Sequence, residues 1–437
     1  MGFNREATDK LIQYIENSVT PYHTVWNVKN RLKAAGFSEL DMRGDWKLRK
    51  NAGYFMDVFG SACVAFYVGS DFKCGSSLKV IAAHTDSPCL RIKTSPERLN
   101  ADGTLSINTE VYGGAILNTW LDRPLCVAGR VMLRGKTAFA PETRLINLKK
   151  SIAVIPNLAI HMNRDINKGT ELNRQTDMLP FLGGTADDDA GDKYAGWLTA
   201  AVSKELGREQ TDILGYDLFV FNNEKPEICG IDDSLLSAPR IDNISSVCAG
   251  CEAFADAAHS ADGLNVLAVW DNEEVGSQTK QGGDSQTLAF LLEKMYLSLG
   301  VDRWEYLSAV LNGLVLSADV AHATHPNHPE RSDITNHAYL NKGVVFKMSG
   351  NQKYASDGET LAIYRAVCDD NKIPYQLFAN RSDIPGGSTI GSLMSSHLPM
   401  RTLDLGIPVL AMHSARELCG TADQEALYRL MKVFCEV

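Results

Sequence analysis

Two adjacent glutamates, Glu273 and Glu274, follow an apolar, β-branched segment at residues 264–269. Such a segment predicts a buried strand, and Gly276 allows the chain to turn sharply after the pair. Adjacent carboxylates repel each other, so keeping both ionised requires a cation between them or protonation of one. Taken alone, the pair also fits two solvated acids on a surface loop. A chemical role is favoured because similar residues recur at other predicted strand ends.

Three further candidate ligands stand at the ends of apolar segments. His84 follows the predicted strand 78–83, Asp319 follows the segment 313–317, and His413 follows the segment 407–412. Asp86 stands two residues after His84, where its carboxylate could orient a metal-binding imidazole. Asp242 precedes a predicted helix at 244–259, a position that also suits a simple helix N-cap.

This set of residues has the composition of a metal centre. In open α/β sheets, sites form beyond the carboxyl ends of the strands. Two histidines and three carboxylates suit two Zn²⁺-like ions that share a bridging carboxylate. The remaining glutamate could then act as the general base on a bridging water.

The composition excludes several classes of function. The chain has 437 residues, 44% hydrophobic and 22% charged, which is typical of a globular protein of two or three domains. Its net charge of −10 without a basic run argues against nucleic-acid binding. No apolar run approaches the roughly 20 residues of a membrane helix, and the first residues lack a signal-peptide core. We therefore expect a cytoplasmic protein with reduced cysteines, in which Cys248 and Cys251 pack in a helix rather than bind metal.

The pattern of elements predicts a discontinuous α/β domain. Helical periodicity at 5–18 and 24–35 is followed by strand-like runs at 53–59, 62–67 and 78–83. Between about 91 and 234 the helical periodicity fades, and short strand-like pieces alternate with turns, including an acidic stretch at 185–192 that fits a solvated loop. Helical patterning then returns. We predict a catalytic domain at 1–91 and 235–437, with a β-rich domain inserted at 92–234.

Seven motifs resemble those of one family, in the family's order and nearly from end to end of the chain. The chain is similar to the M18 metallo-aminopeptidases, the group that contains aspartyl aminopeptidase. The motifs are His84-Thr-Asp-Ser-Pro88, the segment 111–124, Leu158-Ala-Ile-His-Met-Asn-Arg164, Arg240-Ile-Asp-Asn243, Asp271-Asn-Glu-Glu-Val-Gly-Ser277, the segment 317–327 and Met412-His-Ser-Ala-Arg-Glu417.

The resemblance implies a role for each candidate ligand. Asp242 would bridge two divalent ions, zinc or else manganese or cobalt. His84 and Asp319 would complete one site, and Glu274 and His413 the other. Glu273 would be the general base, and Asp86 would hold His84.

The resemblance also implies an architecture. The family has a phosphorylase/hydrolase-like α/β catalytic domain, interrupted by a β-rich dimerisation domain. Its members form homodimers, often assembled further into a tetrahedral dodecamer. The histidine that matches His161 reaches the neighbouring subunit's active site. From the sequence alone, His161 is a histidine in an apolar run, which is more typical of buried structure.

The expected substrates are peptides with a free N-terminus, since metal and carboxylates capture the α-amine. Lys347 aligns with the lysine that pairs with an acidic N-terminal side chain, so we expect a preference for Asp or Glu. A surface lysine is equally compatible with the sequence, and vacuolar-type members accept neutral residues. Gly386 and Gly387 match a substrate-lining loop of the family, although a plain turn has the same composition.

Two other functions fit some of these features. A related dinuclear carboxypeptidase or N-acyl deacylase would use a cationic group for a substrate carboxylate. A non-catalytic assembly protein would use the metal for structure only, and the intact Glu273 argues against it. Hydrolysis of free but not of N-acetylated peptides would distinguish an aminopeptidase from both.

Overall fold

The computed structural model describes residues 5–184 and 194–437, so the predicted acidic loop at 185–192 lies outside the described part of the chain. The chain divides into two compact units. The first comprises residues 1–86, 226–412 and 417–437, and the second comprises 87–225 and 413–416. The boundaries between the units lie after residues 86 and 225. The predicted domain boundaries lie after residues 91 and 234, and they remain a prediction.

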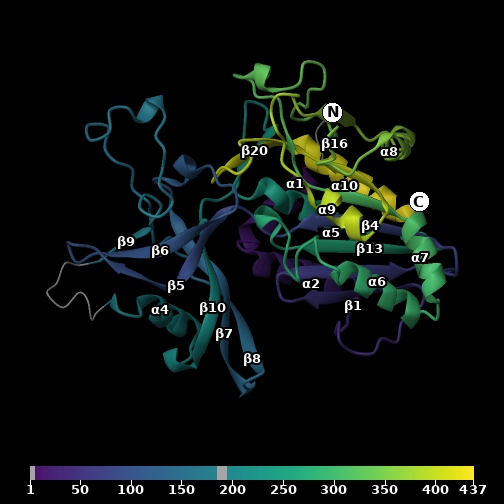
Figure 1. Ribbon diagram of the computed structural model, residues 1–437, viewed down its shortest axis with the longest axis horizontal. Helices are drawn as coiled ribbons and strands as arrows, with labels where there is room; N and C mark the ends of the chain where they lie inside the picture. The colour runs from purple at the N-terminus through teal and green to yellow at the C-terminus, as the bar shows by residue number, and fades with distance from the viewer. Residues whose placement is uncertain (1–4, 185–193) are drawn as a thin grey trace. The chain divides into compact units, whose positions relative to one another are not determined.

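The first unit is organised around a mixed sheet (Figure 1). Its order is β1-β2-β3-β13-β4-β14-β18-β16-β17. The bounds are β1 (Ser38–Glu39), β2 (Ala52–Val58), β3 (Ala62–Val68), β4 (Ser77–His84), β13 (Gly263–Trp270), β14 (Leu314–Ala318), β16 (Val344–Met348), β17 (Tyr375–Ala379) and β18 (Arg401–Gly406). The central strands β13, β4, β14 and β18 run parallel to one another. Their carboxyl ends therefore share one edge of the sheet.

Helices cover both faces of this sheet. Successive residues of β4 enter different cores because side chains alternate along a strand: Ile81 and Ala83 belong to one core, Val80 and Ala82 to the other. The first core packs on α1 (Glu6–Asn17), α2 (Pro21–Ala34), α5 (Ile241–Asp256), α8 (Gly358–Asp370) and α10 (Thr421–Glu436). The second packs on α6 (Thr287–Ser298), α7 (Arg303–Asn312) and α9 (Ile390–His397). Burial on both faces explains the continuous apolar runs of the central strands.

A smaller sheet completes the first unit. Its order is β11-β12-β20-β19-β15, with bounds β11 (Glu227–Cys229), β12 (Leu235–Ala238), β15 (Ala321–His322), β19 (Pro408–Leu410) and β20 (Glu417–Gly420). The predicted strand at 407–412 is thus the three-residue β19. Cys248 and Cys251 are buried free thiols within α5.

The second unit is an antiparallel sheet with one described α-helix, α4 (Trp197–Leu206). The strand order is β8-β7-β10-β5-β6-β9. The bounds are β5 (Cys89–Leu99), β6 (Leu105–Tyr112), β7 (Leu125–Thr137), β8 (Ala140–Asn147), β9 (Phe181–Gly183) and β10 (Ile213–Asn222). Its own core includes Leu90, Val131 and Val220. The β-rich character expected for this part of the sequence is therefore observed.

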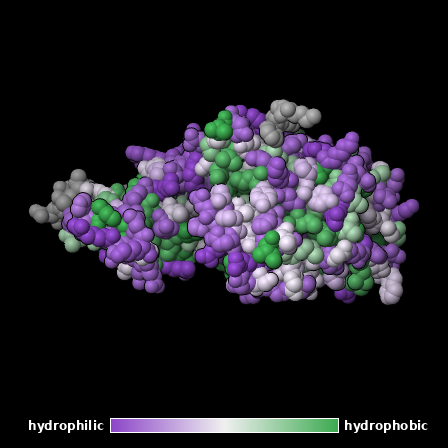
Figure 2. Space-filling model, turned by 90° about the horizontal axis from the view of Figure 1, so that it is seen from above, coloured by the Kyte–Doolittle hydropathy of each residue, from purple (hydrophilic) through white to green (hydrophobic). Residues whose placement is uncertain are grey.

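Hydrophilic side chains cover most of the face seen in Figure 2, and hydrophobic ones appear there in separate patches. Within residues 5–184 and 194–437, no helix has both the length and the hydropathy to cross a bilayer.

Candidate metal centre

Three neighbouring strands of the first unit carry the candidate residues to one edge of the sheet. His84 is the last residue of β4 and pairs in register with Trp270, the last residue of β13. Glu273 follows β13 in a short 3₁₀ turn, and Asp319 follows β14 directly. Parallel strands that end at the same level place these side chains together. The strand ends thus bring these three side chains to the same edge of the sheet.

The orientation of the His84 ring is set by Asp86. The Nδ1 atom of His84 donates to the main-chain carbonyl of Asp86 at 3.1 Å, since a carbonyl can only accept. The Asp86 carboxylate lies 3.4 Å from the same nitrogen. Nε2 is the nitrogen that faces the other acidic residues, 3.3 Å from Asp242 Oδ1 and 3.5 Å from Asp319 Oδ1. An imidazole held in this way is suited to bind a metal through Nε2.

Asp86 also holds the turn of the two glutamates. Its two carboxylate oxygens accept the main-chain N–H groups of Glu273 and Glu274, each at 3.2 Å. Asn272 and Gly276 flank this turn with left-handed backbone conformations, φ 62° and φ 97°. The sequence indicated only the contact between Asp86 and His84; the contact with the turn depends on tertiary structure.

Asp242 stands at the beginning of α5, where the helix is kinked. The N-cap position is Arg240, and Asp242 has non-helical φ −77° and ψ 107°. Its side chain is 3% exposed, and its main-chain N–H donates to Glu417 Oε2 at 3.0 Å. Asp242 therefore lies just before the regular part of α5, a position compatible both with a helix cap and with a metal ligand.

Negative charge accumulates in this buried cluster. Burial, together with Asp319, Asp86 and Asp242 and against the influence of His84, raises the pKa of Glu273 to about 8. Burial and then Asp242 raise the pKa of Glu274 well above its usual value. Burial lowers the pKa of His84, but its contacts with Asp242 and Asp319 outweigh this and raise the pKa well above normal. Carboxylates in this situation are stabilised by a bound cation.

Within the first unit, two groups of donors have the spacing of a metal site. The ligand atoms of His84, Glu273 and Glu274 lie within 4.8 Å of one another, as do those of His84, Asp242 and Asp319. Imidazole and carboxylate are donors that zinc accepts. The residues present therefore fit a divalent metal at this edge of the sheet.

His413 belongs to the second unit and is described there. Its Nδ1 atom lies 3.2 Å from the main-chain carbonyl of Gly114, to which it must donate. Nε2 is thus the nitrogen with the lone pair, as a metal ligand requires. A Cβ atom on Gly114 would lie 3.1 Å from this Nδ1, so the close approach favours glycine. The role of His413 as a ligand stays a prediction.

Lys347 is buried rather than on the surface. It lies in β16 with 2% exposure, and its Nζ atom is 3.5 Å from Asp319 Oδ2 and donates to the Val320 carbonyl at 3.1 Å. The Tyr354 ring centroid lies 5.2 Å from Nζ. Burial opposes the charged form, but Asp319 and Tyr354 outweigh it and raise the pKa of Lys347. Sequence reasoning missed Tyr354, seven residues away in a turn that no periodicity marks.

The glycine loop borders a cavity near the ends of β16 and β17. The cavity measures about 430 Å³ and is lined by residues 348–351 and 379–386. A Cβ atom on Gly386 would lie 2.4 Å from the side-chain nitrogen of Asn380, so a larger residue there would displace the Asn380 side chain. Gly387 has open space around it.

His161 is exposed on a turn of the second unit, next to the exposed Ile160 and Met162. The interpretation of His161 as buried structure is therefore wrong for the single chain.

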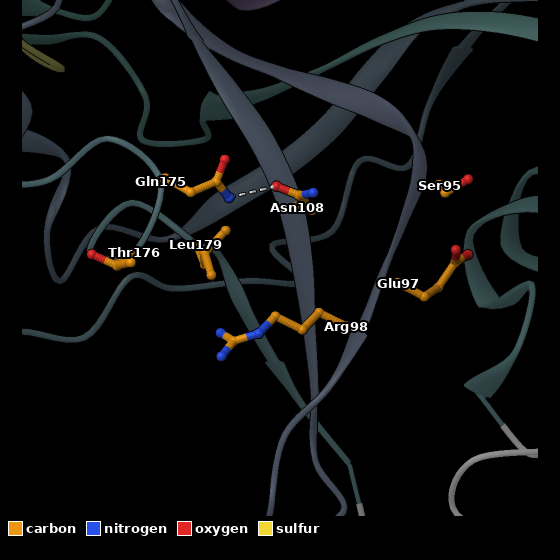
Figure 3. Close-up of a pocket in the computed structure, with 7 residues that line it drawn as sticks. All are labelled: Ser95, Glu97, Arg98, Asn108, Gln175, Thr176 and Leu179. Carbon is orange, nitrogen blue, oxygen red and sulfur yellow. Dashed lines mark hydrogen bonds between the residues drawn. The ribbon is translucent and has the colours of Figure 1, made fainter.

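A different cavity, in the second unit, contains few groups that could bind a metal or take part in catalysis (Figure 3). Its seven described lining residues contain one carboxylate, Glu97, and one guanidinium, Arg98, and neither histidine nor cysteine. The Glu97 carboxylate accepts the main-chain N–H of Leu198, and Gln175 donates to Asn108 at 3.2 Å. These groups serve local structure.

A mixed α/β sheet with buried imidazole and carboxylates at its strand ends defines a candidate metallohydrolase. Residues 14–435 match the sequence model of a family described as aminopeptidase I zinc metalloprotease (M18). A probable M18 family aminopeptidase 2 from Clostridium acetobutylicum is 47% identical over 418 residues, covering 96% of each chain. One from Pseudomonas savastanoi is 38% identical over 431 residues, covering 98% of each chain.

Solved structures agree with this match. A chain in the cryo-EM structure of the Ape4 and Nbr1 complex has a TM-score of 0.92 and 31% identity, with 99% of this chain and 87% of that chain covered. The S. cerevisiae mApe1 dodecamer gives a TM-score of 0.84 and 25% identity, with 98% and 96% covered. The chain therefore belongs to the M18 family of zinc metallopeptidases. It is a hydrolase with aminopeptidase activity.

Proposed function

We propose that this aminopeptidase removes the N-terminal residue of peptides with two divalent ions and with Glu273 as the general base. The observation that carries the proposal is the placement of Glu273. Its side chain is 14% exposed, so it can meet a substrate, and its Oε2 lies 4.0 Å from His84 Nε2. Its main-chain N–H is held by Asp86 at 3.2 Å.

The remaining donors divide into two sets in this proposal. Asp242 would serve both ions, His84 and Asp319 would hold one of them, and Glu274 and His413 would hold the other. Zinc is the metal of the family, and manganese or cobalt would accept the same donors. When bound, such ions supply Lewis-acid activation of the scissile carbonyl and of water.

The protein groups perform the proton transfers. Glu273 takes a proton from the attacking water and delivers it to the leaving amine. Asp86 keeps the Glu273 main chain and the His84 ring in place during both transfers. The acidic cluster also attracts the free α-ammonium group of the substrate, which accounts for removal of the N-terminal residue alone.

We further propose that an N-terminal Asp or Glu is preferred. The buried ammonium of Lys347 supports this, because a cation already out of water pairs strongly with a carboxylate. Its contact with Asp319 gives Lys347 a second task, namely orienting a candidate ligand. A preference for neutral residues, on the same scaffold, is the alternative.

The proposed assembly is a homodimer that continues to a dodecamer. The dodecamer of S. cerevisiae mApe1 supports this for the present chain. In this proposal the unit at 87–225 supplies the dimer contacts, and the exposed His161 acts in the partner's site. The cytoplasmic location stays a prediction.

A substrate panel tests the proposal. Metal-free protein is reloaded with zinc, manganese or cobalt and assayed on glutamyl, aspartyl and leucyl substrates, each also in N-acetylated form. We expect metal-dependent release from the free substrates and none from the acetylated ones. Hydrolysis of the acetylated forms would contradict capture of the α-amine, and faster leucyl release with every metal would contradict the acidic preference.

A further inference from the structure

A fully buried carboxylate, Asp404, lies in β18 outside the strand-end cluster. It has no exposed surface and pairs in register with Ser317, two residues before Asp319. Burial raises its pKa, and the charge of Lys347 opposes that rise. A buried carboxylate is retained at a cost unless its oxygens are well satisfied, so its partners indicate what it does.

Both oxygens of Asp404 accept hydrogen bonds from segments outside the sheet. Oδ1 accepts the Thr389 hydroxyl at 2.6 Å, and Oδ2 accepts the main-chain N–H of Ala355 at 2.6 Å. The main-chain N–H of Asp404 donates to the Ser356 hydroxyl at 2.8 Å. One strand residue thus fixes two separate segments, the turn before α8 and the residue before α9.

The first turn of α9 also packs directly on this carboxylate. A Cβ atom on Gly391 would lie 2.5 Å and 2.7 Å from the two Asp404 oxygens. Glycine is therefore required at this position, because no side chain fits between the helix and the carboxylate. The helix N-terminus adds a favourable partial positive charge.

One anchored segment contacts Lys347 directly, and the other is linked to it through Asn380. The turn that contains Ala355 carries Tyr354, whose ring faces the Lys347 ammonium. The Tyr354 hydroxyl accepts from Asn380 at 3.3 Å. Asn380 in turn packs against Gly386, in the loop that ends at Thr389. Each contact of this series starts or ends at a segment that Asp404 holds.

We propose that Asp404 is a positioning residue for substrate selection: it holds the Tyr354 turn against Lys347, and it anchors the segment at Thr389 that supports this turn through Asn380, without touching the substrate. This inference rests on the proposed function, in which Lys347 reads the N-terminal side chain. Loss of the Asp404 contacts would make the residues around Lys347 more mobile. The kcat/KM for acidic substrates would therefore fall more than that for leucyl substrates.

Two variants test this, with one control. Thr389→Val removes the hydroxyl that reaches Asp404 and keeps the side-chain shape. Asp404→Asn removes the charge and keeps the size. Ser395→Ala in the same helix, whose hydroxyl donates to the Ser392 carbonyl, is the control. The readout is the ratio of kcat/KM for glutamyl over leucyl substrates, with metal content and thermal midpoint measured alongside. We expect the ratio to be about tenfold lower in both variants, because KM for the glutamyl substrate rises. The ratio should be unchanged in the control.

The outcomes separate this inference from the proposed function. A wild-type enzyme without an acidic preference would refute the reading of acidic side chains by Lys347; a changed ratio in Thr389→Val would still support Asp404 as an anchor. The inference would be overturned if the wild type prefers acidic substrates but the two variants, Thr389→Val and Asp404→Asn, lose kcat/KM equally on both substrates. It would also be overturned if neither variant loses any kcat/KM. Thr389→Val decides the matter if Asp404→Asn does not fold.

Discussion

Lys347 Nζ lies 3.5 Å from Asp319 Oδ2, and both side chains are largely buried. The contact joins the residue expected to read the substrate to a residue expected to bind metal. A change at Lys347 can therefore affect activity through the substrate or through Asp319. Measuring substrate preference and metal content on the same samples distinguishes the two effects.

We expect Lys347→Leu to lower kcat/KM on aspartyl and glutamyl substrates by about 10- to 150-fold, the equivalent of one charge-assisted contact. Leucyl substrates should change little, because they do not use the ammonium. Steady-state kinetics on both classes, with metal analysis of the same samples, checks this. Parallel losses on both classes accompanied by loss of metal would show that Lys347 serves mainly to hold Asp319.

Glu273→Gln should reduce kcat by about 10²–10⁴-fold, because the amide cannot accept the proton of the attacking water. Metal content should remain near that of the wild type, since the other donors are intact. Elemental analysis and single-turnover kinetics measure the two effects. A variant that loses its metal would identify Glu273 as a ligand and leave Glu274 as the candidate base.

Asp86→Asn should lower kcat by about 5- to 100-fold, with the fold intact. An amide offers one acceptor oxygen, whereas Asp86 accepts both the Glu273 and Glu274 N–H groups. One buried donor is then left unsatisfied, at a typical cost of about 1–3 kcal/mol. The kcat and the thermal midpoint should be measured together. Unchanged turnover would show that the two contacts matter little for the placement of Glu273.

His161→Ala should be inactive alone if His161 acts in the partner's site. Mixing it with Glu273→Gln after dissociation should restore part of the activity, because some mixed interfaces contain one wild-type pair. Size-exclusion chromatography with two differently tagged variants confirms that mixed assemblies form. Mixed assemblies without recovered activity would rule out the shared site.

Stability should fall between about pH 6.5 and pH 4 through His259. Burial lowers the pKa of His259 to about 4. In the folded chain its Nε2 atom lies 3.0 Å from the Phe254 carbonyl, and its Nδ1 atom lies 3.1 Å from the Asn265 amide nitrogen. The unfolded chain binds the proton near pH 6.5 and the folded chain only near pH 4. The unfolding free energy therefore decreases as the pH falls through this range, by up to about 3 kcal/mol.

His259→Phe provides the comparison for this pH dependence. It keeps an aromatic ring beside Tyr67, on which His259 stacks with 4.2 Å between ring centroids, and it removes the titrating group. Thermal midpoints at pH 7 and pH 5, measured for both proteins after metal removal, should show a smaller drop in the variant. Equal drops would assign the pH dependence to other groups such as His23, whose pKa burial also lowers to about 4.

The residues at the strand ends could be identified from the amino-acid sequence alone. An apolar run followed by a polar ligand is a local pattern, and parallel strands with a common end convert that pattern into proximity. His84, Glu273 and Asp319 could therefore be predicted as neighbours from this pattern alone. The same pattern marked His413 after the segment 407–412, whereas Asp242 precedes a helix, where only the motifs of the M18 family favoured a ligand over a helix cap.

The contacts that support these residues depend on the tertiary fold. Asp86 and Glu273 are 187 positions apart, and their hydrogen bond depends on how β4 and β13 align. The burial of Lys347, its contact with Asp319 and the two segments anchored at Asp404 likewise depend on strand order and register. The physical reason is that these contacts link distant segments, whereas sequence periodicity reports only which side of its own element a residue faces.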